Sequence, residues 1–292
     1  MPDTDDMPSA ADPEQQRLLV VGRPPGAARS PVADLVVPAA LLRARHTAWA
    51  ELVHVSVAAG PTVAFSSKDL RSAGIVRATR IARDAGFAAV VRSPGGRMVA
   101  YDGGAVVIDH LSRSTDLRQA GPSTFAHHAG AHADVLRALG IDARVGEVEG
   151  EYCPGEYSIN VGGRAKIVGS AQRVTGTGAL FSTVVQVAVV DAVREVIVAI
   201  SEALGYPLRE SSIAGLTDHA PRLAPEQVAE AFAADYRRRL AVTDATHEPG
   251  LLEHSARAAS VAPDDRPFDV DAWCRAHPYV PAHDAGGPAA LA

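Results

Sequence analysis

Hydrophobic positions along the chain follow two different periods. Apolar residues at three-to-four spacing predict helices, and Gly86, Gly140 and Gly205 follow three of these stretches as stop signals. Short runs that are apolar and β-branched predict strands between the helices. The predicted helices are 71–85, 123–139, 192–204 and 225–240, and the predicted strands are 52–57, 62–65, 88–92, 105–110, 157–161, 165–168 and 179–190.

The predicted strands come in runs between single helices and do not alternate strictly with them. This order predicts an α+β fold in which a mixed, mostly antiparallel sheet is covered by helices. Gly162 and Gly163 separate two of the strands and indicate a hairpin. Along the chain we expect a disordered tail at 1–16, one domain at 17–242, and an irregular extension at 243–292 with a short helix near 271–276.

Composition narrows the class of protein. The chain has 292 residues, 47% of them hydrophobic, with two cysteines and a formal net charge of −6. The apolar fraction is that of a globular protein, the acidic balance argues against nucleic-acid binding, and two cysteines cannot form a disulfide scaffold. Asp191 and Arg194 interrupt the most apolar stretch, 183–204, so we expect no membrane span. With no signal peptide at the N-terminus, we expect a cytoplasmic protein.

A glycine-rich turn between two predicted strands is the first candidate binding segment. Gly95 and Gly96 would let the backbone approach a ligand closely, because no Cβ intervenes. Arg92 and Arg97 flank them and could neutralise a carboxylate or a phosphate. The alternative is a tight hairpin turn with solvated arginines.

A cysteine and a lysine form the second candidate segment. Cys153 precedes a Pro-Gly turn, where a thiol is more accessible than in a core and a nearby cation would favour the thiolate. Lys166, one of two lysines in the chain, lies in an apolar strand before Gly169, Ser170 and Ala171, whose small side chains leave room for a ligand. The alternatives are a buried, inert cysteine and a solubilising lysine on an edge strand.

These two segments together resemble a known superfamily. R-x-x-G-G-x-x-V-x-x-D-x-G at 92–104 and G-x-x-K-I-x-G-S-A-Q-R at 163–173 are similar to the motifs of lipoate–protein ligases, lipoyl/octanoyl transferases and biotin–protein ligases. The resemblance extends from about 37 to 240. It implies a catalytic domain with the biotin/lipoate ligase fold, which is related to class II aminoacyl-tRNA synthetase catalytic domains.

The resemblance also implies roles for individual residues. Arg92, Gly95 and Gly96 would line an acyl tunnel, and Lys166 would hydrogen-bond the acyl carbonyl and stabilise negative charge there. Further substrate-binding candidates lie in the same two motifs: Arg97, Tyr101, Asp102, Gly169, Ser170 and Ala171.

Departures from the ligase pattern bear on the subfamily. ATP-dependent lipoate ligases carry an Asn-Asp pair before the lysine strand, a third glycine where this chain has Arg97, and a histidine where it has Tyr101. Cys153, by contrast, resembles the acyl carrier of cysteine-dependent octanoyl amidotransferases that unload the glycine-cleavage H protein, although the spacing to Lys166 is one residue longer.

We therefore expect an acyltransferase that moves an octanoyl or lipoyl group onto a lysine of a lipoyl domain through a thioester on Cys153. The partners would be lipoyl domains of 2-oxoacid dehydrogenase complexes or the glycine-cleavage H protein, and no cofactor would be required. One alternative is a ligase that uses ATP and Mg, with Cys153 as a bystander. A second is a non-catalytic relative that binds lipoate or an acyl carrier.

Two weaker signals remain in the sequence, a group of histidines and a second cysteine. His128 and His132 have the i, i+4 spacing of metal ligands, with His127 beside them, but no acidic motif completes a site, so we expect no metal. Cys274 lies in the irregular extension, where we expect a loosely packed or exposed thiol.

Overall fold

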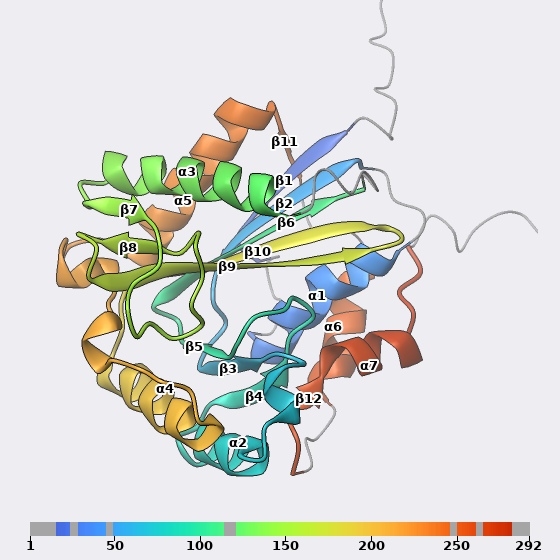
Figure 1. Ribbon diagram of the computed structural model, residues 1–292. Coiled ribbons are helices and arrows are strands. Elements are labelled where there is room, and N and C mark those ends of the chain that lie inside the picture. Colours follow the sequence, from blue (N-terminus) through green and yellow to red (C-terminus); the bar gives the residue numbers. More distant parts are fainter. Residues whose placement is uncertain are drawn as a thin grey trace, which may run out of the picture.

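Two β-sheets and the helices around them build the part of the chain that can be described (Figure 1). The structure, a computed structural model, describes residues 16–23, 29–44, 49–113, 121–245, 250–260 and 265–281. The predicted tail at 1–16 therefore lies outside the described residues, except for its last position.

The larger sheet has eight strands in the order β11-β1-β2-β6-β10-β9-β8-β7. Adjacent strands in this sheet are antiparallel, except for the pairs β11–β1 and β1–β2, which are parallel. The predicted hairpin at Gly162 and Gly163 joins β8 to β9, where both glycines have positive φ. The bounds are β1 Arg17–Val21, β2 Glu51–Val57, β6 Ala105–Ser112, β7 Ala143–Val145, β8 Ile159–Val161, β9 Ala165–Thr175, β10 Gly178–Gln186 and β11 Thr243–Asp244.

A second sheet of four strands corrects the expectation of a single sheet. Its order is β12-β4-β3-β5, and only β3–β5 is antiparallel. The parallel pair β3–β4 arises because a helix connects the two strands, and such a crossover brings both to the same direction. The bounds are β3 Thr62–Phe65, β4 Ala88–Val91, β5 Val99–Tyr101 and β12 Phe268–Asp269.

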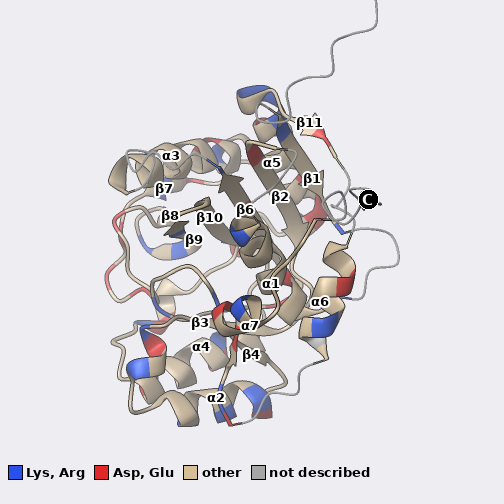
Figure 2. Ribbon diagram, turned by 90° about the vertical axis from the view of Figure 1, so that its right-hand side faces the viewer, with Lys and Arg blue, Asp and Glu red and all other residues tan. Residues whose placement is uncertain are grey.

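Within the described residues, seven α-helices surround these sheets (Figure 1). In the apolar cores, α3 and α5 pack on the larger sheet, α2 and α4 on the smaller sheet, and α1 packs with α6 and α7. Charges of both signs lie on α5 and α6 (Figure 2). The bounds are α1 Pro31–Arg43, α2 Ile75–Asp84, α3 Pro122–Ala138, α4 Asp191–Leu204, α5 Pro225–Leu240, α6 Leu251–Ala259 and α7 Val270–Ala276. Short 3₁₀ turns occupy Asp69–Arg71, Glu210–Ser212 and Leu216–Asp218.

Two helical regions differ from the expectation. The helix α1 was not predicted, because it contains Pro38 and its apolar residues occur all round it, so no amphipathic period is visible. Its start is encoded locally: Ser30 accepts a hydrogen bond from the Ala33 N–H, and Pro31 occupies the first turn. The extension at 243–292 is also not irregular throughout, since α6 and α7 form there and Asp269 caps α7.

Candidate active site

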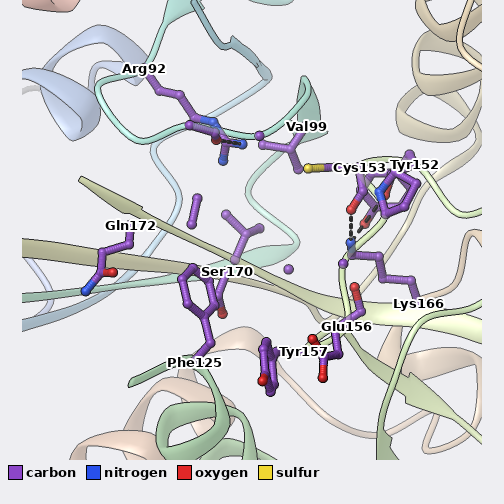
Figure 3. A pocket seen from close by; sticks show the side chains of 18 of the residues that line it. Arg92, Val99, Phe125, Tyr152, Cys153, Glu156, Tyr157, Lys166, Ser170 and Gln172 are labelled. Carbon is purple, nitrogen blue, oxygen red and sulfur yellow. Dashed lines mark hydrogen bonds between the residues drawn. The ribbon is translucent and has the colours of Figure 1, made fainter. Parts of the chain in front are cut away.

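A cavity of about 510 Å³ brings together both candidate segments (Figure 3). Its walls come from the loop after β4, the start of α3, the turn before β8, and strands β5, β9 and β10. Apolar surface is supplied by Val99, Phe125 and Val184. The size is that of a small-molecule site. Of the residues expected at a site, the cavity is lined by Arg92, Gly95, Gly96, Cys153, Lys166, Gly169, Ser170 and Ala171.

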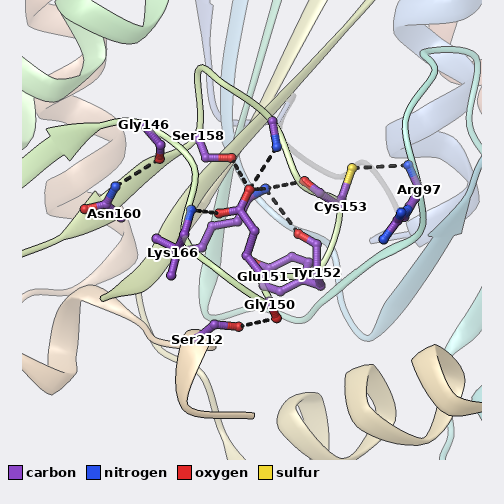
Figure 4. Close-up of polar contacts among 12 residues, drawn as sticks. Arg97, Gly146, Gly150, Glu151, Tyr152, Cys153, Ser158, Asn160, Lys166 and Ser212 are labelled. Atoms are coloured by element: carbon purple, nitrogen blue, oxygen red, sulfur yellow. Dashed lines mark hydrogen bonds and ion pairs between the residues drawn. The ribbon is translucent and has the colours of Figure 1, made fainter. Parts of the chain in front are cut away.

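Cys153 lies in the turn before β8 and is partly exposed to the cavity. Its φ of 48° is in the left-handed region, which is uncommon for a residue with a side chain and recurs at functional sites. Its Sγ accepts a hydrogen bond of 3.1 Å from the Arg97 backbone N–H (Figure 4). The backbone of the glycine loop thus holds the sulfur at the cavity wall.

Gly96 makes this contact sterically feasible. It has a φ of +96°, and a Cβ at this position would lie 3.0 Å from Cys153 Sγ and 2.9 Å from Arg92 Nη2. The positive φ favours glycine at this position, and the close approach of Cys153 and Arg92 leaves little room for a side chain.

Lys166 is buried beneath the cysteine turn. Only 2% of its side chain is exposed, and β9 lies between β10 and β8, so the edge-strand alternative is wrong. Its Nζ donates to Cys153 O at 2.7 Å and Tyr152 O at 3.2 Å, and it pairs with Glu151 Oε1 at 3.4 Å (Figure 4). An ammonium has three hydrogens, so these three contacts engage all of them.

Glu151 was missed by the sequence reasoning. Its side chain is fully buried and accepts hydrogen bonds from the Gly155 N–H at 3.0 Å, the Ser158 hydroxyl at 2.7 Å and the Val148 N–H at 3.3 Å. It therefore holds both ends of the turn as well as Lys166. The signal that could have revealed it is the buried lysine itself, because a buried ammonium requires a counter-ion.

Arg92 holds the glycine loop in shape. Its Nη2 donates to Gly95 O at 2.7 Å and to Arg97 O at 2.9 Å, and the residue is 9% exposed. The solvated-arginine alternative is therefore wrong for Arg92. Arg92 lines the cavity, but its hydrogen bonds are to carbonyls of the glycine loop, so its first role is to hold that loop.

Three expected substrate-binding side chains do not line the cavity. The guanidinium of Arg97 lies 4.5 Å from the ring centroid of Tyr206, so that only its backbone faces Cys153. Tyr101 is packed in the core of the smaller sheet, where burial raises the pKa of its phenol. Asp102 accepts a hydrogen bond from the Gly104 N–H at 2.8 Å and thereby closes a turn. Membership of a motif therefore did not predict which of its side chains line the cavity.

Two histidines of α3, His128 and His132, and the second cysteine are buried in the interior, whereas the neighbouring His127 is exposed. Burial lowers the pKa of His128 to about 2 and that of His132 to about 3, and His132 Nε2 lies 3.1 Å from the Tyr236 hydroxyl. Nowhere in the described ranges do three or more His, Cys, Asp or Glu residues form a group able to hold a metal. Cys274 is 3% exposed, which corrects the expectation of an exposed thiol, and burial raises its pKa to about 11.

Among the described helices, none is long and apolar enough to cross a membrane.

The chain is similar in sequence to known lipoyl ligases and octanoyltransferases. The family model described as lipoyl protein ligase A/B catalytic domain matches residues 67–237. The octanoyl-[GcvH]:protein N-octanoyltransferase of Geobacillus kaustophilus is 31% identical over 112 residues, which are 38% of this chain and 39% of that protein. The chain thus matches about two fifths of the length of this curated relative.

Solved structures confirm the predicted fold. A lipoate-protein ligase A bound with ATP aligns with a TM-score of 0.61 and 21% identity, over 83% of this chain and 93% of that one. A lipoate protein ligase from T. acidophilum with bound lipoic acid aligns with a TM-score of 0.58 and 20% identity, over the same shares of the two chains.

Proposed function

This chain belongs to the lipoyl protein ligase A/B catalytic-domain family, and from that premise we propose that it is a cysteine-dependent octanoyl or lipoyl transferase. The observation that carries the proposal is the position of Cys153: its sulfur faces a cavity with apolar walls and accepts a backbone N–H. The similarity to an octanoyl-[GcvH]:protein N-octanoyltransferase supports the same choice.

The reaction proceeds in two halves. The Cys153 thiolate attacks the carbonyl of an acyl group carried on a donor lysine. A C–S bond forms, the C–N bond breaks, and the departing amine takes a proton from solvent. The neutral amine of an acceptor lysine then attacks the thioester. A C–N bond forms, the C–S bond breaks, the attacking nitrogen releases a proton to solvent, and the thiolate is regenerated.

The described residues suit these steps. The acyl chain would lie against Val99, Phe125 and Val184 in the cavity. Lys166 borders the same cavity, and it could stabilise the oxyanion if the acyl oxygen replaced one of its three present acceptors. Because each half-reaction uses the thiol alone as carrier, neither ATP nor a metal is needed, and donor and acceptor can occupy the same surface in turn.

The partners follow from this chemistry and from the relatives. A glycine-cleavage H protein carrying an octanoyl group is the proposed donor, as the name of the curated relative suggests. Lipoyl domains of 2-oxoacid dehydrogenase complexes are the proposed acceptors.

Intact-mass spectrometry after incubation with an octanoylated H protein, without ATP, tests the proposal. We expect one octanoyl adduct on the wild type and on Cys274→Ser, and none on Cys153→Ala. Full transfer to a lipoyl domain by Cys153→Ala would refute the thioester. Pyrophosphate release that depends on free lipoate would favour the ligase, and lipoate binding without any transfer would favour a non-catalytic relative.

A further inference from the structure

The peptide unit between Gly96 and Arg97 lies between two side chains that are distant in sequence. Its N–H donates to Cys153 Sγ at 3.1 Å, and its carbonyl oxygen accepts a hydrogen bond of 2.7 Å from the Ser66 hydroxyl. The peptide is planar, and in the trans form its C=O and N–H point in opposite directions. Anchoring the oxygen to Ser66 therefore fixes the direction in which the N–H points, which is toward the sulfur.

Ser66 is itself held in one orientation. It is fully buried directly after β3, and its N–H donates to Asp69 Oδ2 at 2.7 Å. Its hydroxyl oxygen accepts from the Lys68 N–H at 3.1 Å and the Asp69 N–H at 3.3 Å. A serine hydroxyl has one hydrogen, and with its oxygen accepting two amides that hydrogen is directed to Gly96.

Asp69, which accepts from the Ser66 N–H, is itself held by Tyr206. The Tyr206 hydroxyl donates to Asp69 Oδ1 at 2.6 Å, and the Tyr206 ring lies under the Arg97 guanidinium. Asp69 is fully buried and so ties Ser66 and Tyr206 to one point of the fold. Arg92 completes the frame by donating to the Arg97 carbonyl at 2.9 Å.

We propose that Ser66 is a positioning residue that sets the reactivity of Cys153 through the Gly96–Arg97 peptide. The proposal rests on the proposed function, in which Cys153 is the nucleophile. A hydrogen bond to the charged form of a group favours that form, so a well-aimed N–H increases the thiolate fraction. The Ser66 hydroxyl polarises the same peptide from its oxygen side, which strengthens the N–H as a donor.

Alkylation of Cys153 by iodoacetamide as a function of pH tests this role, with Ser66→Ala as the variant. Ser67→Ala is the matched control, because it removes the same hydroxyl from the exposed neighbouring residue. We expect Ser66→Ala to shift the midpoint of the alkylation profile upward by about half to one pH unit, which is roughly three- to tenfold slower alkylation near neutral pH. The rate at high pH, where the thiol is fully ionised, should stay within about twofold of wild type.

A merely structural role for Ser66 predicts a different result. It would lower thermal stability while the midpoint, measured well below the melting temperature, stayed where it is in the wild type. An unchanged midpoint in folded Ser66→Ala therefore overturns the proposal, and Ser66→Thr, which keeps the hydroxyl, should retain the wild-type midpoint.

A measurement on the wild type covers the case in which Ser66→Ala does not fold. The amide proton of Arg97, followed by NMR, should shift with the same midpoint as Cys153 alkylation. Absence of that shift overturns the proposal without any variant. The octanoyl adduct on wild-type Cys153 is scored separately. A missing adduct refutes the proposed function, whereas an adduct together with an unchanged Ser66→Ala midpoint refutes only the role of Ser66.

Discussion

Replacing Glu151 with glutamine removes the negative charge that faces Lys166. The side chains of these two residues are 0% and 2% exposed, and Glu151 Oε1 lies 3.4 Å from Lys166 Nζ. Glutamine keeps an oxygen that can accept from Gly155 and Ser158, but it leaves the ammonium buried without a counter-ion. Because the pair is hidden from solvent, water cannot take over the lost interaction.

The size of the effect follows from that burial. Removing one partner of a buried pair costs about 3–5 kcal/mol, because an uncompensated charge remains. For a domain of this size, each kcal/mol lowers the melting temperature by roughly 2–4 °C, so Glu151→Gln should melt about 6–20 °C below wild type. The same substitution loosens the turn that carries Cys153, and we therefore expect slower formation of the acyl adduct.

Urea unfolding followed by circular dichroism measures this cost, with Glu149→Gln as the matched control. Glu149 lies two residues away, is 83% exposed and pairs with Arg209 at 2.8 Å, so its loss should cost less than about 1 kcal/mol. The double variant Glu151→Gln/Lys166→Met removes both charges and should recover part of the lost stability. A Glu151→Gln protein as stable as Glu149→Gln would refute the reasoning, as would a double variant whose loss equals the sum of the single losses.

Two further predictions concern the cysteines and pH. Native protein treated with iodoacetamide at pH 7.5 should be alkylated on Cys153 and not on Cys274, because burial and a pKa of about 11 keep Cys274 in its thiol form. Peptide mapping distinguishes the two cysteines. Labelling of Cys274 before Cys153 would contradict this prediction. The pKa values of His128 and His132, about 2 and about 3, lie below the ordinary value near 6.5, so the unfolded chain takes up protons first and stability falls as the pH drops below about 6.5. Burial raises the pKa of Asp109 to about 7, and its protonation works in the opposite direction, but one group does not offset two. A urea midpoint that rises between pH 6.5 and 5 would contradict this expectation.

The sequence revealed the candidate reactive residues more readily than the residues that hold them in place. Cys153, Lys166 and the Gly95-Gly96 pair could be found because each stands out in its own local context: a thiol in a turn, a rare lysine in an apolar strand, and adjacent glycines between strands. Strand and helix positions were predicted for the same reason, since periodicity is a local property.

The residues that hold this chemistry in place could not be found in the same way. Ser66 acts 30 positions away in the sequence, on Gly96, and Glu151 acts through four contacts of which one is with Lys166, 15 positions away. Such partners become neighbours only after the sheets have formed. At Tyr101 and Asp102 the motif predicted substrate-binding positions, whereas neither side chain lines the cavity.

The pairing of β12 with β4 has a consequence for how the protein is made. Phe268 and Asp269 pair with Val90 and Val91, directly before Arg92, so the strand that leads into the glycine loop gains its outer neighbour from a segment about 180 residues later. During translation, the smaller sheet stays incomplete while the larger sheet, α4 and α5 leave the ribosome. A premature stop codon between α5 and β12 would then release a chain that has every residue of the cavity wall but an open β4 edge, which is the kind of edge that promotes aggregation.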